Sequence, residues 1–265
     1  MTYLEREARL TGHESWGSYH RLRIFAPEIA KRASPGQFVM IRINESYLPL
    51  LRRPFSLHHR LEDEIEIFFK VVGQGTAQLA AKKEGDIIDL LGPLGRGFSF
   101  PARAEERPAL LIAGGRGIAP FLFLAHELRR LGQRFIIFYG GKTVEDLPLA
   151  PELEALGFDL RLSTEDGRLG FRGLITELLA RELPSLSPAR FYVCGPEGML
   201  AEVARISRQW QIPAEFSLEA RMGCGFGACY GCVWPIHRGE KIEWTRICLE
   251  GPVFPGEAIA WERKK

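Results

Sequence analysis

Four cysteines in the last third of the chain have a spacing that suits a metal centre. Cys224, Cys229, Cys232 and Cys248 follow the pattern C-x4-C-x2-C-x15-C, and the first three lie within the stretch CGFGACYGC. A C-x4-C-x2-C run followed by a distant cysteine is the plant-type arrangement for a 2Fe–2S cluster. The glycines between these cysteines let the backbone fold inwards, so that its amides point at the sulfur atoms. The spacing therefore predicts a 2Fe–2S cluster held by these four thiolates.

Two other readings of the same cysteines are a zinc site and buried free thiols. Zinc usually takes paired C-x2-C units, and this region has one such unit, Cys229 with Cys232. Buried free thiols have no reason to gather among glycines. The chain has five cysteines in all, and an odd number in a reducing compartment argues against a framework of disulfides. The cluster is the favoured reading.

Composition limits the partners and the location of the protein. The 265 residues carry a formal net charge of +2, which gives no electrostatic reason to expect nucleic acid or an acidic membrane surface as a partner. No apolar run approaches the roughly 20 residues that cross a bilayer. The first residues, MTYLEREARLTG, lack the apolar segment of a secretory signal. We expect a cytoplasmic protein with neither a membrane nor a nucleic-acid partner.

The first hundred residues have the pattern of an antiparallel β-barrel. Turn residues separate short apolar runs at about ten-residue spacing, and these runs cover 22–25, 38–43, 54–59, 65–72 and 86–92. The helical pattern in this part is limited to 76–83. We therefore predict a first domain over residues 1–100.

A second pattern begins near Pro108. Apolar strands at 109–115, 134–141, 158–164 and 190–196 alternate with helical segments such as 118–132. This alternation predicts a parallel sheet covered on both faces, an α/β domain over residues 101–215. Residues 216–265 are rich in Cys and Gly, and we expect a small, irregular domain with little core, held together by its metal.

Two motifs in the barrel could bind phosphate. RRPFSL (52–57) places Arg, an aromatic residue and Ser on one strand, and VVGQGT (71–76) ends a strand in a Gly-rich turn before a helix. Arg53 and Phe55 would share a face, with Ser56 pointing elsewhere unless the strand bends. The turn can present amides to an anion. Taken singly, each motif is weak, because an Arg in a strand is usually a solvated edge residue and Gly-x-Gly is usually a plain turn.

Two Gly-rich strand ends mark a nucleotide cleft in the second domain. AGGRGIAP (113–120) and CGPEGML (194–200) each follow an apolar strand and precede a helix, which is where parallel sheets bind nucleotides. After the strand at 158–164 come Glu165 and Asp166, whose carboxylates would bind ribose hydroxyls and repel a 2′-phosphate, favouring NAD over NADP. A plain turn is the alternative for Glu165 and Asp166. A buried strand-end thiol is the alternative for Cys194.

In this order, the motifs RxFS, GxGT, GxGIAP and CGP resemble those of the ferredoxin–NADP reductase superfamily. That resemblance implies a flavin-binding antiparallel barrel followed by a nicotinamide-binding α/β domain. The segment LEARMGCGFGACYGC, leading to RICLEGPVF (218–254), resembles the electron-transfer subunits of the NAD-dependent, two-subunit dihydroorotate dehydrogenases. The resemblance covers essentially the whole chain and is most specific in this last segment.

The resemblance assigns roles to the residues of these motifs. Arg53 would pair with the FAD diphosphate, Phe55 would lie against the isoalloxazine, and Ser56 would bond near its reactive nitrogen. Ser56 and Cys194 are then the candidate catalytic residues. The remaining cofactor-binding candidates are Pro54, Val72, Gly73, Gly75 and Thr76 for FAD, and Gly115, Gly117, Pro120, Glu165, Asp166, Gly195 and Pro196, with Cys194, for NAD. Arg116 departs from the family, which usually carries Thr or Gly there, and would either contact the dinucleotide or narrow its pocket.

The function implied is an electron relay in pyrimidine biosynthesis. An FMN-containing catalytic subunit would oxidise dihydroorotate, and electrons would pass through the 2Fe–2S cluster and FAD of this chain to NAD. The resemblance also implies a heterotetramer with two subunits of each kind, and Phe226, Tyr230 and Trp234 are candidates for the interface or for packing the cluster. One alternative is a diaphorase subunit of a hydrogenase, sulfur reductase or bifurcating complex. Another is a non-catalytic redox sensor or assembly subunit.

Overall fold

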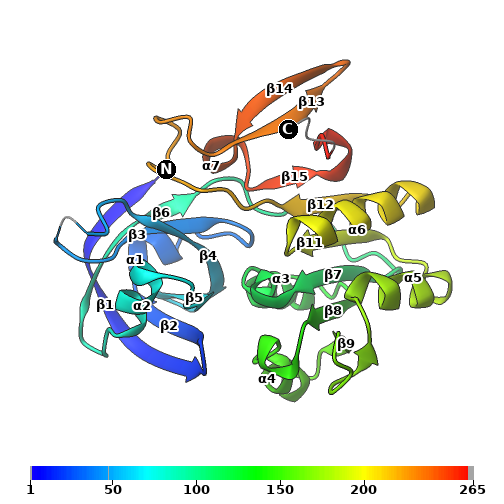
Figure 1. Cartoon of the computed structure of the whole chain (residues 1–265), viewed down its shortest axis with the longest axis horizontal. Coiled ribbons are helices and arrows are strands. Elements are labelled where there is room, and N and C mark those ends of the chain that lie inside the picture. Colours follow the sequence, from blue (N-terminus) through cyan, green and yellow to red (C-terminus); the bar gives the residue numbers. More distant parts are fainter. Residues whose placement is uncertain (1, 47, 262–265) are drawn as a thin grey trace.

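The computed structural model describes residues 2–46 and 48–261, and its amino-terminal part is a closed six-stranded barrel (Figure 1). All strand pairs in it are antiparallel, in the order β1-β2-β5-β4-β3-β6. The strands are β1 (Tyr3–Trp16), β2 (Tyr19–Phe25), β3 (Phe38–Arg42), β4 (Arg53–Arg60), β5 (Glu64–Lys70) and β6 (Ile87–Leu94). Two short helices, α1 (Pro27–Ala30) and α2 (Gln74–Ala80), lie in the connections. The predicted barrel is confirmed.

The strand β1 is absent from the sequence-based prediction. Its sequence, YLEREARLTGHESW, has few apolar residues, and Ala8 and Leu10 are the two that are buried in the barrel core. Its charged side chains lie on the outer side. Because the apolar residues are so sparse, this strand has no apolar run of the kind that located the other five.

The second domain is a seven-stranded sheet in the order β10-β9-β8-β7-β11-β12-β15. The first six strands are parallel: β7 (Ala109–Gly114), β8 (Phe135–Gly141), β9 (Asp159–Thr164), β10 (Phe171–Arg172), β11 (Arg190–Cys194) and β12 (Ala214–Ser217). One face packs against α3 (Phe121–Arg130) and α4 (Ala150–Ala155), and the other against α5 (Ile175–Leu186) and α6 (Glu197–Trp210). Two 3-10 turns, η1 (Gly115–Ile118) and η2 (Val144–Asp146), follow β7 and β8. This is the predicted α/β domain.

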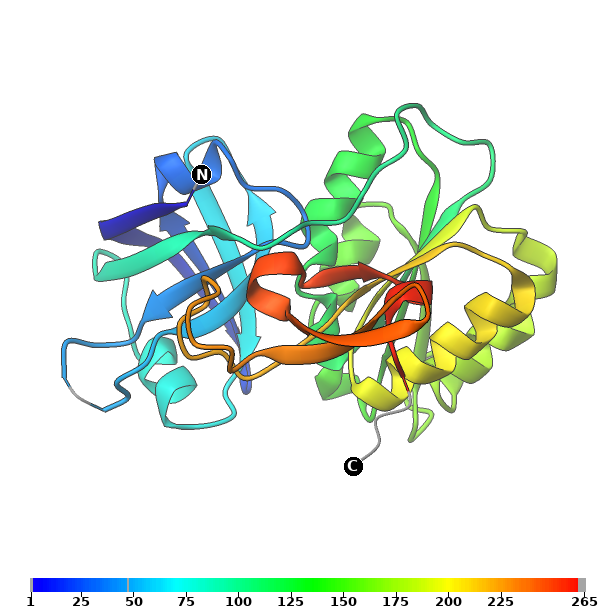
Figure 2. The same ribbon diagram turned by 90° about the horizontal axis from the view of Figure 1, so that it is seen from above.

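The carboxyl-terminal segment is more regular than predicted. It forms a hairpin of β13 (Val233–Arg238) and β14 (Lys241–Arg246), then α7 (Ile247–Glu250), β15 (Val253–Pro255) and η3 (Gly256–Ala258). The hairpin and α7 lie over the junction of the two larger domains (Figure 2). The predicted boundary at residue 216 falls inside β12, and residues 262–265 of the predicted domain lie outside the described residues.

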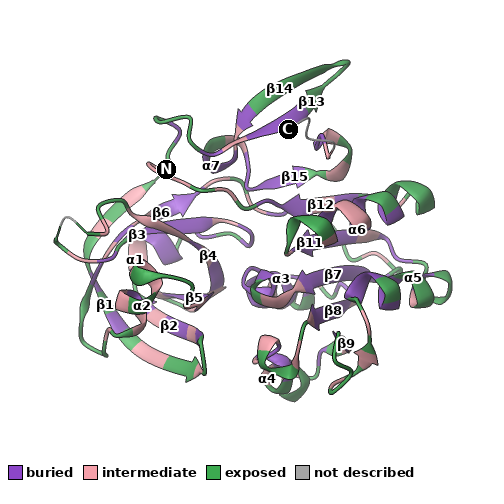
Figure 3. Cartoon of the chain, viewed as in Figure 1, coloured by how far each residue is buried: buried purple, intermediate pink, exposed green. Residues whose placement is uncertain are grey.

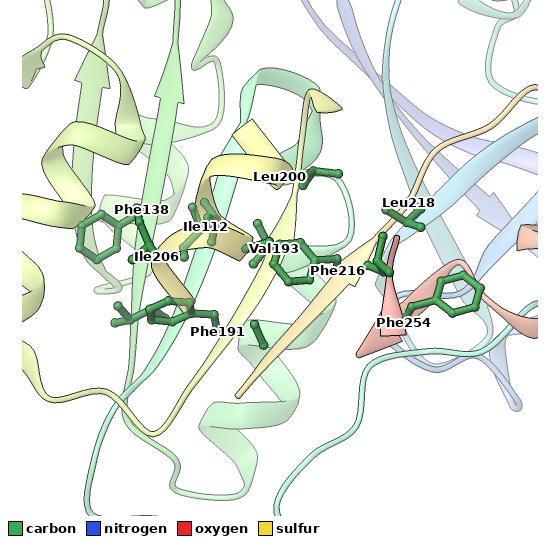
Figure 4. Close-up of a cluster of buried hydrophobic side chains, with 14 of the residues drawn as sticks. Ile112, Phe138, Phe191, Val193, Leu200, Ile206, Phe216, Leu218 and Phe254 are labelled. Carbon is green, nitrogen blue, oxygen red and sulfur yellow. The ribbon is translucent and has the colours of Figure 1, made fainter. Parts of the chain in front are cut away.

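This segment shares the core of the α/β domain. β15 pairs antiparallel with β12, with Phe254 opposite Phe216. Trp234, Ile236 and Ile247 are buried in the same apolar cluster as the inner faces of α5 and α6. Figure 3 shows this buried band, and Figure 4 shows it running from Phe138 to Phe254. The segment is therefore less dependent on core residues of its own than expected, because apolar packing anchors it to the α/β domain; the expected contribution of the metal stays a prediction.

Polar contacts fix the barrel against the α/β domain. Arg21 of β2 binds Glu152 of α4, with an Nη1–Oε1 distance of 2.6 Å. The buried His58 of β4 has its Nδ1 2.6 Å from the carbonyl oxygen of Ala119. These contacts hold the end of β4 close to the loop after β7, which brings the barrel and nucleotide motifs together. No helix in the described part of the chain is long and apolar enough to span a membrane.

Candidate functional site

Two adjoining cavities lie where the barrel, the α/β domain and the segment after β12 meet. The first has a volume of about 240 Å³ and the second about 660 Å³. Lys70, Arg116 and Glu219 line both of them. Two ligands bound in these cavities would therefore meet at a border formed by these three side chains.

The first cavity is lined by most of the residues predicted to bind flavin, although Arg53 does not line it. Pro54, Phe55 and Ser56 of β4 line it together, so that Ser56 lies in the same cavity as Phe55. Phe55 is buried and packs edge-on against Phe69, with 5.3 Å between ring centroids. Pro120 and Cys194 close the side that the α/β domain provides. An apolar slot with a few polar atoms is the environment that suits a planar ring system.

Arg53 lies beside the turn that opens α2. A Cβ on Gly75 would be 3.5 Å from the Nε atom of Arg53. In the described part of the chain no carboxylate pairs with Arg53, whereas the neighbouring Arg52 binds both oxygens of Asp89 at 2.8 Å. A guanidinium without an anionic partner, next to a Gly-rich turn, is suited to bind a diphosphate.

The turn itself is shaped by Thr76. Its Oγ1 accepts hydrogen bonds from the amides of Val72 at 2.9 Å and of Gly73 at 3.1 Å. Val72 and Thr76 line the first cavity, whereas Gly73 and Gly75 do not. Because the Thr76 hydroxyl already accepts hydrogen bonds from these two amides, Thr76 fixes the shape of the turn.

The second cavity lies at the carboxyl ends of four parallel strands. Its walls include Gly115 after β7, Gly140 and Gly141 at the end of β8, Glu165 after β9, and the pair Gly195–Pro196 after β11. The end of β7 packs closely against the loop after β11, since a Cβ on Gly114 would lie 2.7 Å from the Cδ of Pro196. A crevice at this edge is where open α/β sheets bind nucleotides.

Four predicted nucleotide residues lie outside this cavity: Pro120 and Cys194 line the first cavity instead, and Gly117 and Asp166 line neither. Gly117 is buried, and a Cβ there would be 2.2 Å from the carbonyl oxygen of Cys194, so it serves the packing of η1 on β11. The carboxylate of Asp166 accepts a hydrogen bond from the amide of Arg168 at 3.1 Å, as in a plain turn. Glu165 is thus the carboxylate of this pair that lines the cavity.

Cys194 is a neutral thiol at the inner wall of the first cavity. Burial is the main cause that raises the pKa of this thiol far above its usual value, with a contribution from the charge of Glu219. Ser217 forms a hydrogen bond with it. The side chain can therefore donate or pack, but it does not act as a thiolate at ordinary pH.

The cysteine loop directs backbone amides at one sulfur. Burial opposes ionisation of Cys224, but amides from Cys229, Phe226 and Ala228 lower its pKa to about 6. The amide nitrogen of Ala228 lies 3.2 Å from the Cys224 sulfur. Such amides stabilise a thiolate, which is the form that binds iron.

The four cysteines form two pairs. The free thiols of Cys224 and Cys229 share a hydrogen bond. The amide nitrogen of Cys248 lies 3.4 Å from the Cys232 sulfur, and burial and this neighbour raise the Cys248 pKa to about 12. Among the described residues, no three His, Cys, Asp or Glu side chains are grouped to hold a single metal ion. Pairs of thiols suit a cluster of two irons, in which each iron takes two protein ligands.

The cysteine loop rests on the barrel. A Cβ on Gly225, whose φ is +81°, would lie 2.4 Å from the Cγ of Met40 in β3. Met222, two residues before Cys224, lines the first cavity. Phe226 and Tyr230 are exposed, but Trp234 is buried and packs into the core, so it is not available for an interface.

Sequence reasoning missed Tyr19, Lys70 and Glu219. Tyr19 and Lys70 both bind the carboxylate of Asp146, at 2.9 Å each, at the edge of the second cavity. Lys70 has a local signal, because it ends the apolar strand EIEIFFK. Glu219 has none, since its contact with Arg116 depends on how distant segments meet.

Comparisons with known proteins agree with this arrangement. Residues 219–260 match the model of the iron–sulfur cluster binding domain of dihydroorotate dehydrogenase B, and residues 111–205 match that of the oxidoreductase NAD-binding domain. The structure of an NADH-dependent reduced ferredoxin–NADP oxidoreductase superimposes with a TM-score of 0.84 and 27% identity, covering 97% of this chain and 91% of the other. A ferredoxin NADP+ reductase from Neisseria gonorrhoeae shares the fold, with a TM-score of 0.64, 23% identity and coverage of 79% and 91%.

Relatives found by sequence identify the family more narrowly than the structural neighbours do. The dihydroorotate dehydrogenase B (NAD(+)) electron transfer subunit of Desulforamulus reducens is 39% identical over 239 residues, which are 89% of this chain and 90% of that protein. This level of identity over nearly the full length is what a shared family gives. The chain belongs to the family of electron transfer subunits of NAD(+)-dependent dihydroorotate dehydrogenase B.

Proposed function

We propose that this chain carries electrons from a dihydroorotate-oxidising partner subunit, through its 2Fe–2S cluster and FAD, to NAD. The observation that carries this proposal is the continuity of the three sites. The nucleotide cavity and the flavin cavity share Lys70, Arg116 and Glu219, and the flavin cavity reaches Met222 at the start of the cysteine loop. Electrons then have one short path through the chain.

The residues around the flavin cavity hold and orient the cofactors. FAD, when bound, exchanges two electrons with a nicotinamide and single electrons with an iron–sulfur cluster. Arg53 binds the diphosphate, Phe55 covers the ring, and Ser56 and the neutral thiol of Cys194 lie where nicotinamide and flavin meet. The four cysteine thiolates hold the cluster.

The nucleotide cavity favours NAD over NADP. Glu165 is exposed and lines the cavity at the end of β9. A carboxylate at that position binds the hydroxyls of the adenosine ribose and repels a 2′-phosphate. Reduction of the flavin should therefore be faster with NADH than with NADPH.

The partner subunit docks on the face around the cysteine loop. We call this the docking face and define it by Leu50, Leu51, Phe226, Tyr230 and Trp244, all of which are more than half exposed. Leu51 belongs to the barrel, yet its Cδ1 lies 3.9 Å from the Cβ position of Gly223. Tyr230 stacks under Arg246, whose guanidinium carbon is 4.4 Å from the ring centroid. Exposed aromatic and Arg side chains of this kind are typical of interface centres.

The exposed Cys229 lies in the cysteine loop between Phe226 and Tyr230 of this face. A partner's flavin must come close to the cluster to exchange electrons, and this is the open side of the loop. The partner is an FMN-containing catalytic subunit, the complex contains two subunits of each kind, and it works in the cytoplasm. By function the chain divides into the flavin barrel (1–100), the nucleotide domain (101–215) and the cluster segment (216–265), although β12 and the shared core cross the last boundary.

An anaerobic titration of the purified chain with NADH tests the relay. Bleaching of bound FAD together with the electron paramagnetic resonance signal of a reduced 2Fe–2S cluster is the expected result. If both cofactors are present and NADH reduces neither, the relay is wrong and a redox sensor or assembly subunit becomes the better reading.

The likeness to a ferredoxin–NADP oxidoreductase structure favours one alternative, a diaphorase subunit of a larger complex such as a bifurcating one. NADH would bleach the flavin in that case too, so the partner decides. Co-purification with a flavin-containing dehydrogenase that oxidises dihydroorotate supports the relay. Co-purification with a nickel or multi-cluster subunit supports the alternative.

A further inference from the structure

Arg116 and Glu219 form an ion pair on the border between the two cavities. The Nη2 of Arg116 lies 3.1 Å from the Oε2 of Glu219, and the two side chains are 53% and 54% exposed. Arg116 belongs to η1 after β7, whereas Glu219 lies just after β12, on the segment that leads to the cysteine loop. Each partner lines both cavities.

We infer that Glu219 pairs with Arg116 while the cavity holds no nucleotide. When the dinucleotide binds, its diphosphate replaces the Glu219 carboxylate as the partner of Arg116. This inference rests on the proposed binding of NAD. Arg116 follows the first strand of the parallel sheet at its carboxyl end, where a dinucleotide diphosphate lies in such folds. A diphosphate carries more charge than one carboxylate, and its oxygens match both prongs of a guanidinium.

The backbone of Arg116 is fixed, so the exchange takes place in the side chain. Gly117 packs on the carbonyl oxygen of Cys194, and the amide of Ala119 donates to the carbonyl of Arg116 at 3.1 Å. The ion pair is easy to separate, because exposed pairs contribute little to stability. Glu219 is then left in contact with water, so its separation from Arg116 costs little free energy.

The other cation on the border is already engaged. The Nζ of Lys70 binds Asp146 at 2.9 Å and lies 4.8 Å from the ring centroid of Tyr19. Asp146 also accepts hydrogen bonds from Tyr19 and from the amide of Lys142. Lys70 is therefore part of a network in which three groups share the carboxylate of Asp146. Arg116, in contrast, has one ion-pair partner on the border, the carboxylate of Glu219. Arg116 is therefore the border cation that a diphosphate can take over.

ADP-ribose tests this exchange because it carries the diphosphate and cannot be reduced. We would measure its affinity for the full chain, loaded with FAD and cluster, by isothermal titration calorimetry. Arg116→Gln is expected to weaken binding about tenfold through loss of a charge-assisted contact. Arg116→Lys should recover part of the loss. Glu219→Gln should strengthen binding about threefold, since the competing carboxylate is gone.

Two further measurements separate exchange from a general effect of charge. The double variant Arg116→Gln/Glu219→Gln should bind ADP-ribose like Arg116→Gln alone, because Glu219 acts through Arg116. AMP, which lacks the diphosphate, should bind all variants equally. Arg130→Gln serves as the matched control, since Arg130 forms an exposed ion pair of 2.9 Å with Glu127 in α3 and lines neither cavity.

The outcomes are distinct. If Arg116→Gln binds ADP-ribose as well as the unaltered chain, or more tightly, the inference is overturned, and tighter binding would make Arg116 an obstacle. If the affinity of Arg116→Gln for AMP falls in parallel with its affinity for ADP-ribose, the effect is not on the diphosphate and the inference is also wrong. If the unaltered chain binds neither ADP-ribose nor NADH, the proposed function fails, and the inference fails with it.

Discussion

Gly117 lies against the backbone of Cys194, so closely that a Cβ on residue 117 would be 2.2 Å from the carbonyl oxygen of Cys194. Gly117 belongs to η1, after β7, and Cys194 ends β11, and these two strands are neighbours in the sheet. The contact therefore sets the spacing of two Gly-rich strand ends. The flavin cavity and the nucleotide cavity both depend on that spacing, because Arg116 lines both of them, Cys194 lines the first and the next residue, Gly195, lines the second.

A methyl group at Gly117 should push these strand ends apart. Gly117→Ala meets backbone atoms that cannot turn away, and overpacking of this kind costs about 1–3 kcal/mol. We expect a lower melting temperature and weaker binding of NADH, measured by thermal unfolding and by flavin bleaching. Gly198→Ala is the control for stability, since Gly198 is in α6 and has nothing within 4 Å of its Cβ position. Equal melting temperatures for the two variants would contradict this account.

Arg53 should be the cation that retains FAD. Arg53→Ala removes a guanidinium that has no carboxylate partner among the described residues, so the loss should fall on the cofactor rather than on the fold. We expect the FAD affinity to drop by about ten- to a hundredfold, the equivalent of one or two charge-assisted bonds. The measurement is the ratio of flavin to protein after dialysis. Arg42→Ala is the control, because Arg42 is an exposed residue of β3 outside both cavities.

Two histidines at the domain junction should make the fold sensitive to acid. Burial lowers the pKa of His58 to about 3 and that of His59 to about 4. In the unfolded chain both have the usual value of about 6.5, so between pH 6.5 and 4 the unfolded state binds more protons. The free energy of unfolding should therefore fall as the pH drops through this window, by up to about 1.4 kcal/mol per pH unit for each proton.

The test of this pH dependence is a substitution that keeps the packing. His59 stacks on His126, with ring centroids 4.5 Å apart, and meets Phe123 edge-on. His59→Phe should flatten the loss of stability between pH 7 and pH 5 in urea unfolding. His237→Phe, at an exposed position on β13, should leave the pH dependence unchanged. A His59→Phe variant as sensitive to acid as the original chain would show that His59 plays no part.

The sequence allowed the prediction of those features that are local. The Gly-rich strand ends and the apolar runs of five barrel strands each lie within short segments, and the structure has them in place. The cysteine spacing is local too, and the match of residues 219–260 to an iron–sulfur domain agrees with it. Strand β1 could not be predicted because its outer face is charged and just two of its apolar side chains are fully buried. Gly117 and Asp166 fit the nucleotide motifs by position, but their side-chain contacts are those of packing and of a turn.

Relationships between distant segments could not be predicted. Lys70 and Glu219 are 149 positions apart, from the difference of their numbers, and meet on one border because β5 and the segment after β12 approach the same cavities. The core contribution of Trp234 and Phe254 is of the same kind. Glycine and cysteine content made this segment seem irregular, whereas its few apolar residues are buried against the α/β domain.

That anchoring leads to a prediction about loss of the cluster. Cys229→Ser removes a ligand on the exposed side of the loop, and we expect the 2Fe–2S signal to disappear while the chain remains folded. Trp234, Ile236 and Phe254 should keep the hairpin and β15 in place without iron. FAD content and bleaching by NADH should persist, and electron transfer from the partner should cease. Loss of FAD together with the cluster would mean that iron, and not the apolar core, holds this segment.

Disruption of the docking face should separate the partner from the relay. Tyr230→Asp and Leu51→Asp place a charge on exposed apolar positions of the docking face, next to Cys229 in the chain and beside Gly223 respectively, and burying an unpaired charge opposes association. Each variant should weaken the complex with the catalytic subunit by at least about tenfold, as aromatic residues at interface centres do. The measurement is co-elution with that subunit, alongside bleaching of FAD by NADH, which should be unaffected. Trp210→Asp is the matched control, because Trp210 is an exposed aromatic at the end of α6, away from the cysteine loop. If Trp210→Asp weakens the complex and the two other variants do not, the partner binds elsewhere on the molecule, and the electrons must reach the cluster from a different side.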